Sequence, residues 1–124
     1  MKKKIITTCV CFLLPGCVSA PTKEELANAD YGECPIRYET IIKAKMEGIL
    51  FDPESARYQF EPPQKSYAYV FENENSPFGK VVYGWQVKTL INAKNRLGGY
   101  TGFQLYTFLF RGDNLITWEF WPGR

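Results

Sequence analysis

The chain has 124 residues, with 15 lysines and arginines against 13 aspartates and glutamates, and its formal net charge is +2. This length supports one domain with a modest core. The sequence contains no histidine, so the most common general base and the most common metal ligand are both missing. We therefore expect no metal, no cofactor and no histidine-based catalysis.

The first 16 residues are typical of an export signal. Residues 2–4 are all lysine, and the apolar run of residues 5–14 is shorter than the roughly 20 residues that a membrane span needs. The run ends in Leu14-Pro15-Gly16-Cys17, which resembles the lipobox of bacterial lipoproteins. That resemblance implies cleavage before Cys17, a diacylglycerol on its sulfur and an acyl chain on its amine.

Acylation of Cys17 predicts attachment to a membrane. A single acyl chain holds a protein only marginally, whereas the several chains of a lipoprotein give a stable anchor. Val18 stands where the inner-membrane retention signal of such lipoproteins has aspartate. By that resemblance we expect a protein at the outer membrane that faces the periplasm, and an inner-membrane location facing the same compartment remains the alternative.

Loss of the signal changes the charge and the cysteine count. Removing the first 16 of 124 residues leaves 108, and three of the 15 basic residues leave with them, so 12 basic residues face 13 acidic ones. A nucleic-acid partner is not expected, because phosphate binding needs a concentrated basic surface. With Cys17 acylated, Cys34 is the one remaining thiol. It either forms an intermolecular disulfide or, as we favour, is a partly buried small hydrophobe.

One helix is predicted near the start of the mature chain. Residues 17–33 carry Pro21, several charges and few large apolar side chains, which predicts a flexible tether after the lipidated cysteine. A helix is predicted over residues 36–48, with Pro35 in its first turn. Its apolar side chains recur at helical spacing: Tyr38, Ile41, Ile42, Met46 and Ile49. Asp52-Pro53 then predicts a short helical turn.

The remaining residues predict β-structure. Alternating apolar residues and turn signals give five strands, at Arg57–Glu61, Tyr67–Glu72, Lys80–Asn92, Phe103–Phe110 and Leu115–Trp121. Gly84, inside the longest of them, indicates a bulge or a tight backbone contact. Residues 34–124 are thus predicted to form a single α+β domain, in which one N-terminal amphipathic helix packs on a curled antiparallel sheet.

The turn of the last hairpin, Arg111-Gly112-Asp113-Asn114, leaves the register open. A two-residue turn would place Leu105 and Leu109 on the face of Trp118, and a one-residue slip exchanges the faces. We favour a three-residue turn, because it gathers six apolar side chains on one face: Tyr106, Phe108, Phe110, Ile116, Trp118 and Phe120. The Arg-Gly-Asp tripeptide matches an adhesion motif, but glycine and aspartate are turn formers in this position.

The segment Ala93–Thr101 is longer than a hairpin requires. It spends about nine residues where two to five suffice, and Gly98-Gly99 permits backbone angles closed to other residues. One interpretation is a wide hairpin end whose asparagines cap their own backbone. The other is a protruding loop that contacts a partner. The candidate binding residues are Asn92, Lys94, Asn95, Arg96, Tyr100 and Thr101.

A family resemblance is carried by motifs spread over the mature chain. They include Asp52-Pro53-Glu54-Ser55-Ala56 and the run from Ile91 to Gly102, which reads INAKNRLGGYTG. The sequence resembles a family of small, uncharacterised bacterial lipoproteins. The resemblance implies a place in the cell envelope, and it implies no activity, ligand or cofactor.

These observations predict a membrane-anchored, non-catalytic module that binds an envelope protein or a glycan. Tyr67, Tyr69 or Trp121 would offer a platform for either partner. One alternative is an inhibitor of a hydrolase that plugs the active site with loop 93–101. The other is a hydrolase acting on peptidoglycan, which would need two acids about 5–10 Å apart. Glu119 is the acid inside a late strand, where we expect it to face solvent.

Overall fold

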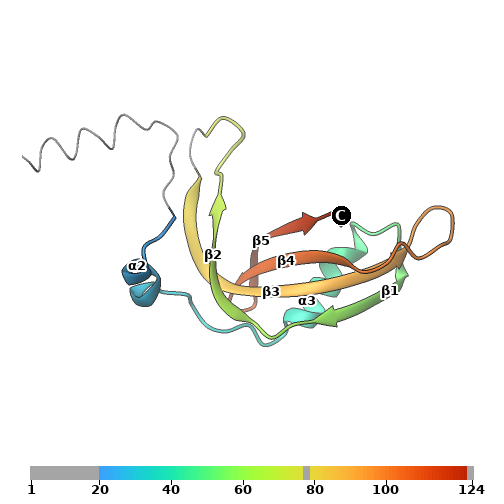
Figure 1. Cartoon of the computed structure of the whole chain (residues 1–124), viewed down its shortest axis with the longest axis horizontal. Helices are drawn as coiled ribbons and strands as arrows, with labels where there is room; N and C mark the ends of the chain where they lie inside the picture. Colours follow the sequence, from blue (N-terminus) through green and yellow to red (C-terminus); the bar gives the residue numbers. More distant parts are fainter. Residues whose placement is uncertain (1–19, 77–78, 123–124) are drawn as a thin grey trace, which may run out of the picture.

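Five antiparallel strands form one open, mostly β domain with two small helices (Figure 1). The computed structural model describes residues 20–76 and 79–122, so the signal segment and Cys17 lie outside the described residues. The helices are α2 (Lys23–Asn28) and α3 (Tyr38–Glu47). The strands are β1 (Asp52–Phe60), β2 (Gln64–Val70), β3 (Lys80–Lys94), β4 (Gln104–Arg111) and β5 (Asn114–Trp121).

Strand β3 is the centre of the sheet. Its C-terminal half pairs with β1, its N-terminal half pairs with β2, and its other edge pairs with β4, which in turn pairs with β5. Pro62 and Pro63 separate β1 from β2, because proline has no N–H to donate to the ladder. The N–H of Glu61 still donates to the carbonyl of Lys88 at 2.9 Å. β1 and β2 are therefore two segments of one bent edge.

The core lies between α3 and one face of the sheet. Ile42 and Met46 of α3 are completely buried. They pack against side chains that alternate along β3 and β4, namely Val87, Ile91, Phe108 and Phe110. The helical spacing noted in the sequence thus marks the buried side of α3, except at Ile49, which lies beyond the end of the helix and is exposed.

Gly84 allows β4 to approach β3 closely. A Cβ atom at this position would collide with the carbonyl oxygen of Phe110 and press on the side chain of Leu109. The tight backbone contact expected at Gly84 is therefore confirmed. Figure 1 shows β2 and the N-terminal half of β3 turned up from the rest of the sheet, so that the sheet is curved.

Some predictions of local structure are wrong, beginning with the segment before the first predicted strand. The Asp52-Pro53 segment is the start of β1 rather than a helical turn, with an irregular register between Asp52 and Arg57. The hydroxyl of Ser55 accepts the N–H of Lys94 at 2.9 Å and donates to the carbonyl of Asp52 at 2.7 Å. These two backbone groups therefore have hydrogen-bond partners where the strand pairing is irregular.

The flexible tether does not extend through residue 33. Thr22 and Glu25 form a capping box, with N–H to side-chain oxygen distances of 3.1 and 2.9 Å, and this box begins α2. The chain then packs on the sheet through Tyr31, whose ring lies 5.7 Å from that of Tyr83. The domain therefore has a second helix that we did not predict. Cys34, for which we favoured partial burial, is exposed.

The last hairpin has a two-residue turn and a bulge. Arg111 pairs with Asn114, and the register shifts between Leu109 and Phe110. The bulge adds one residue to β5, so the side chains beyond it point to the opposite face of the sheet. A three-residue turn would have had the same effect on the register. The favoured face is thus correct for Tyr106, Phe108, Trp118 and Phe120, but the turn is wrong, and Leu115 rather than Ile116 pairs with Phe110.

Candidate functional site

The hairpin tip, residues 95–101, extends past the end of the sheet between β3 and β4 (Figure 1). Asn95 organises it through both its backbone and its side chain. Its N–H donates to the Gly99 carbonyl at 2.9 Å, and its carbonyl accepts from Gly98 at 3.0 Å. Its side-chain oxygen accepts the N–H groups of Leu97 and Gly99 at 2.9 and 3.3 Å. Gly98 adopts φ = +81°, which favours glycine. The tip is therefore a folded structure.

The base of the hairpin tip is fastened to β1. The hydroxyl of Tyr100 donates to the Ser55 carbonyl at 2.9 Å, and Tyr100 forms a bridge with Lys94. The Arg57 guanidinium lies 4.4 Å from the centre of the Tyr100 ring, and the Lys94 ammonium lies 5.6 Å from it. Such cation–π contacts contribute about 0.5–1 kcal/mol at exposed sites. The tip is thus held at a fixed angle to the sheet.

The predicted binding residues divide into three groups by what their side chains contact. Two asparagines serve the loop itself: Asn95 as described, and the buried Asn92, whose side-chain oxygen accepts the N–H of Gly102 at 3.0 Å. Lys94 and Tyr100 contact one another. Arg96 and Thr101 are exposed. The asparagines therefore cap their own backbone, as the first interpretation proposed, and the loop also protrudes, as the second required.

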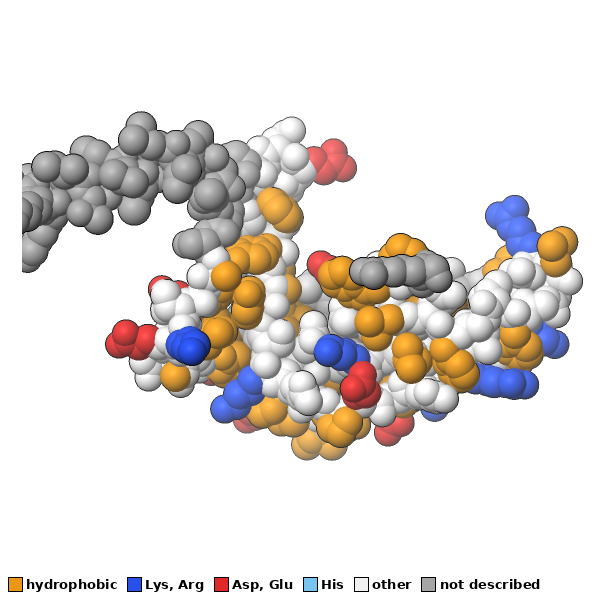
Figure 2. All heavy atoms as spheres, viewed as in Figure 1, with side chains coloured by type: hydrophobic (Ala, Val, Ile, Leu, Met, Phe, Trp, Pro, Cys, Tyr) orange, Lys and Arg blue, Asp and Glu red, His pale blue; other side chains and the backbone are white. Residues whose placement is uncertain are grey.

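Leu97 is the residue that sequence reasoning missed. Its relative exposure is 93%, at the very end of the hairpin tip. We sought polar binding groups in a polar loop, whereas the informative signal was one large aliphatic side chain among turn formers. Figure 2 shows basic and hydrophobic side chains together on the surface at this end of the molecule. The tip thus presents Leu97 beside the exposed Arg96.

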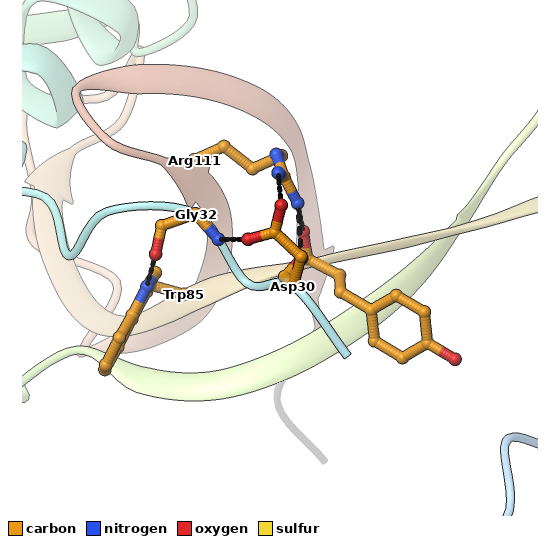
Figure 3. Close-up of polar contacts among 5 residues, drawn as sticks. Asp30, Gly32, Trp85 and Arg111 are labelled. Carbon is orange, nitrogen blue, oxygen red and sulfur yellow. Dashed lines mark hydrogen bonds and ion pairs between the residues drawn. The ribbon is translucent and has the colours of Figure 1, made fainter. Parts of the chain in front are cut away.

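The Arg111 side chain holds the N-terminal segment against the sheet (Figure 3). Its guanidinium donates to the carbonyls of Asp30 and Tyr83 at 2.7 and 2.9 Å, and to the Asp30 carboxylate at 3.4 Å. The N–H of Gly32 donates to the same carboxylate, and the indole N–H of Trp85 donates to the Gly32 carbonyl at 3.0 Å. The Gly32 hydrogen bond, followed by the charge of Arg111, lowers the pKa of Asp30.

Asp113 binds the backbone just before α3 from the neighbouring turn. Its carboxylate accepts the backbone N–H groups of Arg37 and Ile36 at 3.0 and 2.8 Å, and the Arg37 side chain at 3.2 Å. These backbone hydrogen bonds are the main reason why the pKa of Asp113 is lowered. Both charged side chains of the Arg-Gly-Asp tripeptide are thus bonded within the domain, which supports its assignment as structure rather than as an adhesion motif.

The groove is a hollow on the face of the curved sheet opposite α3. It encloses about 650 Å³. Its lining includes side chains that alternate with those of the core: Ser66, Ala68, Gln86, Thr107, Leu109, Thr117, Glu119 and Trp121. Gln86 pairs with Leu109, which pairs with Thr117, while Thr107 pairs with Glu119. Figure 2 shows a notch between the raised part of the sheet and the rest of the molecule.

The acidic side chains of the described residues are not gathered into one cluster. Glu119 is the one acidic side chain in the lining of the groove. Within residues 20–76 and 79–122, no three histidine, cysteine or acidic side chains come together as metal ligands would. No helix in the same part of the chain has the length and apolar character to cross a membrane. Comparison with protein-family models, curated proteins and solved structures gives no match for this chain.

Proposed function

We propose that this protein is a lipid-anchored, non-catalytic module of the cell envelope that binds a protein partner through its hairpin tip. The anchor is Cys17, which follows from the lipobox resemblance, and the expected location is the periplasmic side of the outer membrane. The observation that carries the binding proposal is the exposure of Leu97 at the end of a loop that is itself held by hydrogen bonds.

The hairpin tip has the physical properties of a binding element. Burying a leucine side chain contributes about 1.5–3 kcal/mol, and at 93% exposure almost all of that remains for a partner. Because Asn95 already orders the loop, little conformational entropy is lost when the tip binds. Arg96 adds a positive charge beside Leu97. The partner that fits is a protein with an apolar pocket and an acidic group at its rim.

The place of α2 in the domain supports a partner that lies away from the membrane. Within the described residues, α2 and the hairpin tip lie at opposite ends of the domain (Figure 1). A lipid at Cys17 would attach the α2 end to the membrane, so the tip would be directed away from the lipid surface. A protein in the periplasm is therefore the partner that the tip can reach.

A hydrolase inhibitor remains a second candidate within the same proposal. A narrow, preorganised hairpin that projects beyond the sheet has the shape needed to enter an active-site cleft. The hydrolase alternative has less support, because a paired-carboxylate mechanism needs a second acid facing Glu119, and the lining of the groove supplies none.

A double variant tests the proposal. We expect Arg96→Ala with Leu97→Ala to leave the free energy of unfolding within about 0.5 kcal/mol of wild type, because both side chains are exposed. The same variant should lose the main product of chemical crosslinking in cells. Ile36→Ala is the matched control, since Ile36 is also an exposed aliphatic residue, at 84%, and lies outside the hairpin tip. An unchanged crosslinking pattern in the double variant would remove the tip from the binding surface.

A further inference from the structure

The groove lies on the sheet face opposite the core. On the α3 face, Phe108 and Phe110 fill the space beside the helix. On the opposite face, the raised edge of the sheet contributes the small residues Ser66, Ala68 and Gly79 and the aromatic residues Tyr67, Tyr69 and Phe71 to the lining. The cavity of about 650 Å³ is within the range of small-molecule sites. It is separate from the hairpin tip, so the function proposed above does not use it.

Trp121 gives one wall of the groove a fixed aromatic surface. Its indole N–H donates to the Thr107 hydroxyl at 3.2 Å, which orients the ring, while 51% of the residue remains exposed. A half-exposed tryptophan held by its own N–H is a flat, apolar platform. The C–H groups on one face of a sugar ring pack well on such a surface, because the face of the indole ring is electron-rich and the sugar C–H groups are weakly positive.

Hydrogen-bonding groups lie on the same strand as this platform and on the two strands beyond it. Glu119 is opposite Thr107, the residue that accepts from Trp121. Gln86 and Thr117 flank Leu109 on the two neighbouring strands. Adjacent strands are about 4.8 Å apart, so these groups spread over a distance comparable with the hydroxyl groups of one or two sugar rings. Each sugar hydroxyl donates and accepts, which suits a mixture of amide, hydroxyl and carboxylate.

The charge of the lining selects among ligands. Glu119 is the one charged side chain among the lining residues, and Lys88 lies on the same face two strands away, outside the lining. An anionic ligand would meet the Glu119 carboxylate without a lining cation to balance it. An acyl chain would bury Gln86 and Thr117 without hydrogen bonds, which is costly. A ligand that is neutral or carries an amine meets neither penalty.

We propose that the groove binds a neutral or amino-substituted oligosaccharide, with one sugar ring against Trp121 and its hydroxyl groups on Glu119, Gln86 and Thr117. This site is independent of the protein-binding hairpin tip. Variants of the groove and variants of the tip should therefore lose different ligands.

Calorimetric titration of the mature protein purified from cells tests the site. The probes are triacetylchitotriose, chitosan trimer, maltotriose and cellotriose, with trigalacturonate as the anionic comparison. We expect saturable binding of at least one neutral or amino probe with a Kd of about 1 mM or tighter, and no binding of trigalacturonate. Binding of none of the four probes, or equal binding of trigalacturonate, would overturn the proposal.

Variants then place the ligand. Trp121→Ala should weaken binding at least tenfold, and Glu119→Gln, which keeps the shape of the side chain, should weaken it by several fold. Phe51→Ala is the matched control, because Phe51 is an exposed aromatic residue, at 65%, outside the groove, and its replacement should leave the Kd unchanged. If Trp121→Ala alters the fold, the affinity of Glu119→Gln for the oligosaccharide tests the site instead. Wild-type affinity in a folded Trp121→Ala or in Glu119→Gln contradicts the assignment.

Discussion

Thr89 is a polar residue in an otherwise apolar core. It is completely buried on β3, where it pairs with Phe60 on one side and Tyr106 on the other. Its hydroxyl oxygen has no hydrogen-bond partner among the described residues. A buried hydroxyl without a partner costs about 1–3 kcal/mol, while valine has nearly the same shape and no polar group.

We expect Thr89→Val to raise the free energy of unfolding by about 1 kcal/mol. Urea unfolding followed by tryptophan fluorescence measures the change as a shift of the midpoint at constant slope. Thr107→Val is the matched control, because the Thr107 hydroxyl accepts the indole N–H of Trp121, and its loss should destabilise the protein. Destabilisation by Thr89→Val as well would mean that the Thr89 hydroxyl is hydrogen-bonded in the folded protein.

At the scale of elements, two aspartates connect the last hairpin and the N-terminal segment. Asp113 binds the backbone of Arg37 just before α3, and Asp30 binds Arg111. Folding lowers the pKa of both carboxyl groups. A group whose pKa is lower in the folded state adds stability above its unfolded pKa, about 3.9 for aspartate, and that stability is lost as the pH falls through the folded pKa.

We therefore expect the N-terminal segment to detach below about pH 4, before the core of the sheet unfolds. The measurement is hydrogen exchange of the Trp85 indole N–H, which is bonded to the Gly32 carbonyl. In Asp113→Asn the acid dependence of this exchange should be weaker, because one of the two titrating groups is gone. The quantity compared is the protection factor, that is, the exchange rate relative to an unfolded chain at the same pH. A protection factor that is constant between pH 3 and 6 in the wild-type protein would contradict a role for these carboxylates.

The sequence predicted the elements that depend on local periodicity, and it failed where distant residues decide. Apolar spacing located α3 and the central strands to within a few residues. The capping box of α2 was readable at Thr22 and Glu25 but was overlooked among the charges of the supposed tether. The bonds of Arg111 to Asp30, 81 positions apart in the chain, have no local signal.

The protrusion of residues 93–101 was expected from the sequence, but the division of their side chains between internal contacts and solvent was not. Residues 93–101 were identified by their unnecessary length, and the structure shows that the segment protrudes. Which side chains are free depends on the loop conformation. The side-chain oxygens of Asn92 and Asn95 accept backbone N–H groups of the loop, whereas the side chain of Leu97 is exposed. A list of polar residues cannot reveal that division, because it arises from the hydrogen bonding of the folded hairpin.

For the molecule as a whole, the proposed lipid anchor at Cys17 would decide where the hairpin tip can act. Cys17 lies outside the described residues, so chemistry must test it. We expect Cys17→Ser to abolish labelling by a radioactive fatty acid and to leave the unprocessed precursor, because the cysteine sulfur carries the diacylglycerol in proteins with this signal. Normal labelling and processing of that variant would end the lipoprotein proposal, while the hairpin and groove proposals would stand on their own experiments.

We propose that the hairpin tip, and Leu97 in particular, contacts a protein partner. The most direct measurement is photocrosslinking in living cells of full-length protein that carries a photoreactive amino acid at position 97, or at position 36 as the exposed control. We predict that position 97 gives one discrete, light-dependent crosslinked product, heavier than the protein by the mass of a single partner. Position 36 should give no such product. No product from position 97, or the same products from both positions, would contradict the account.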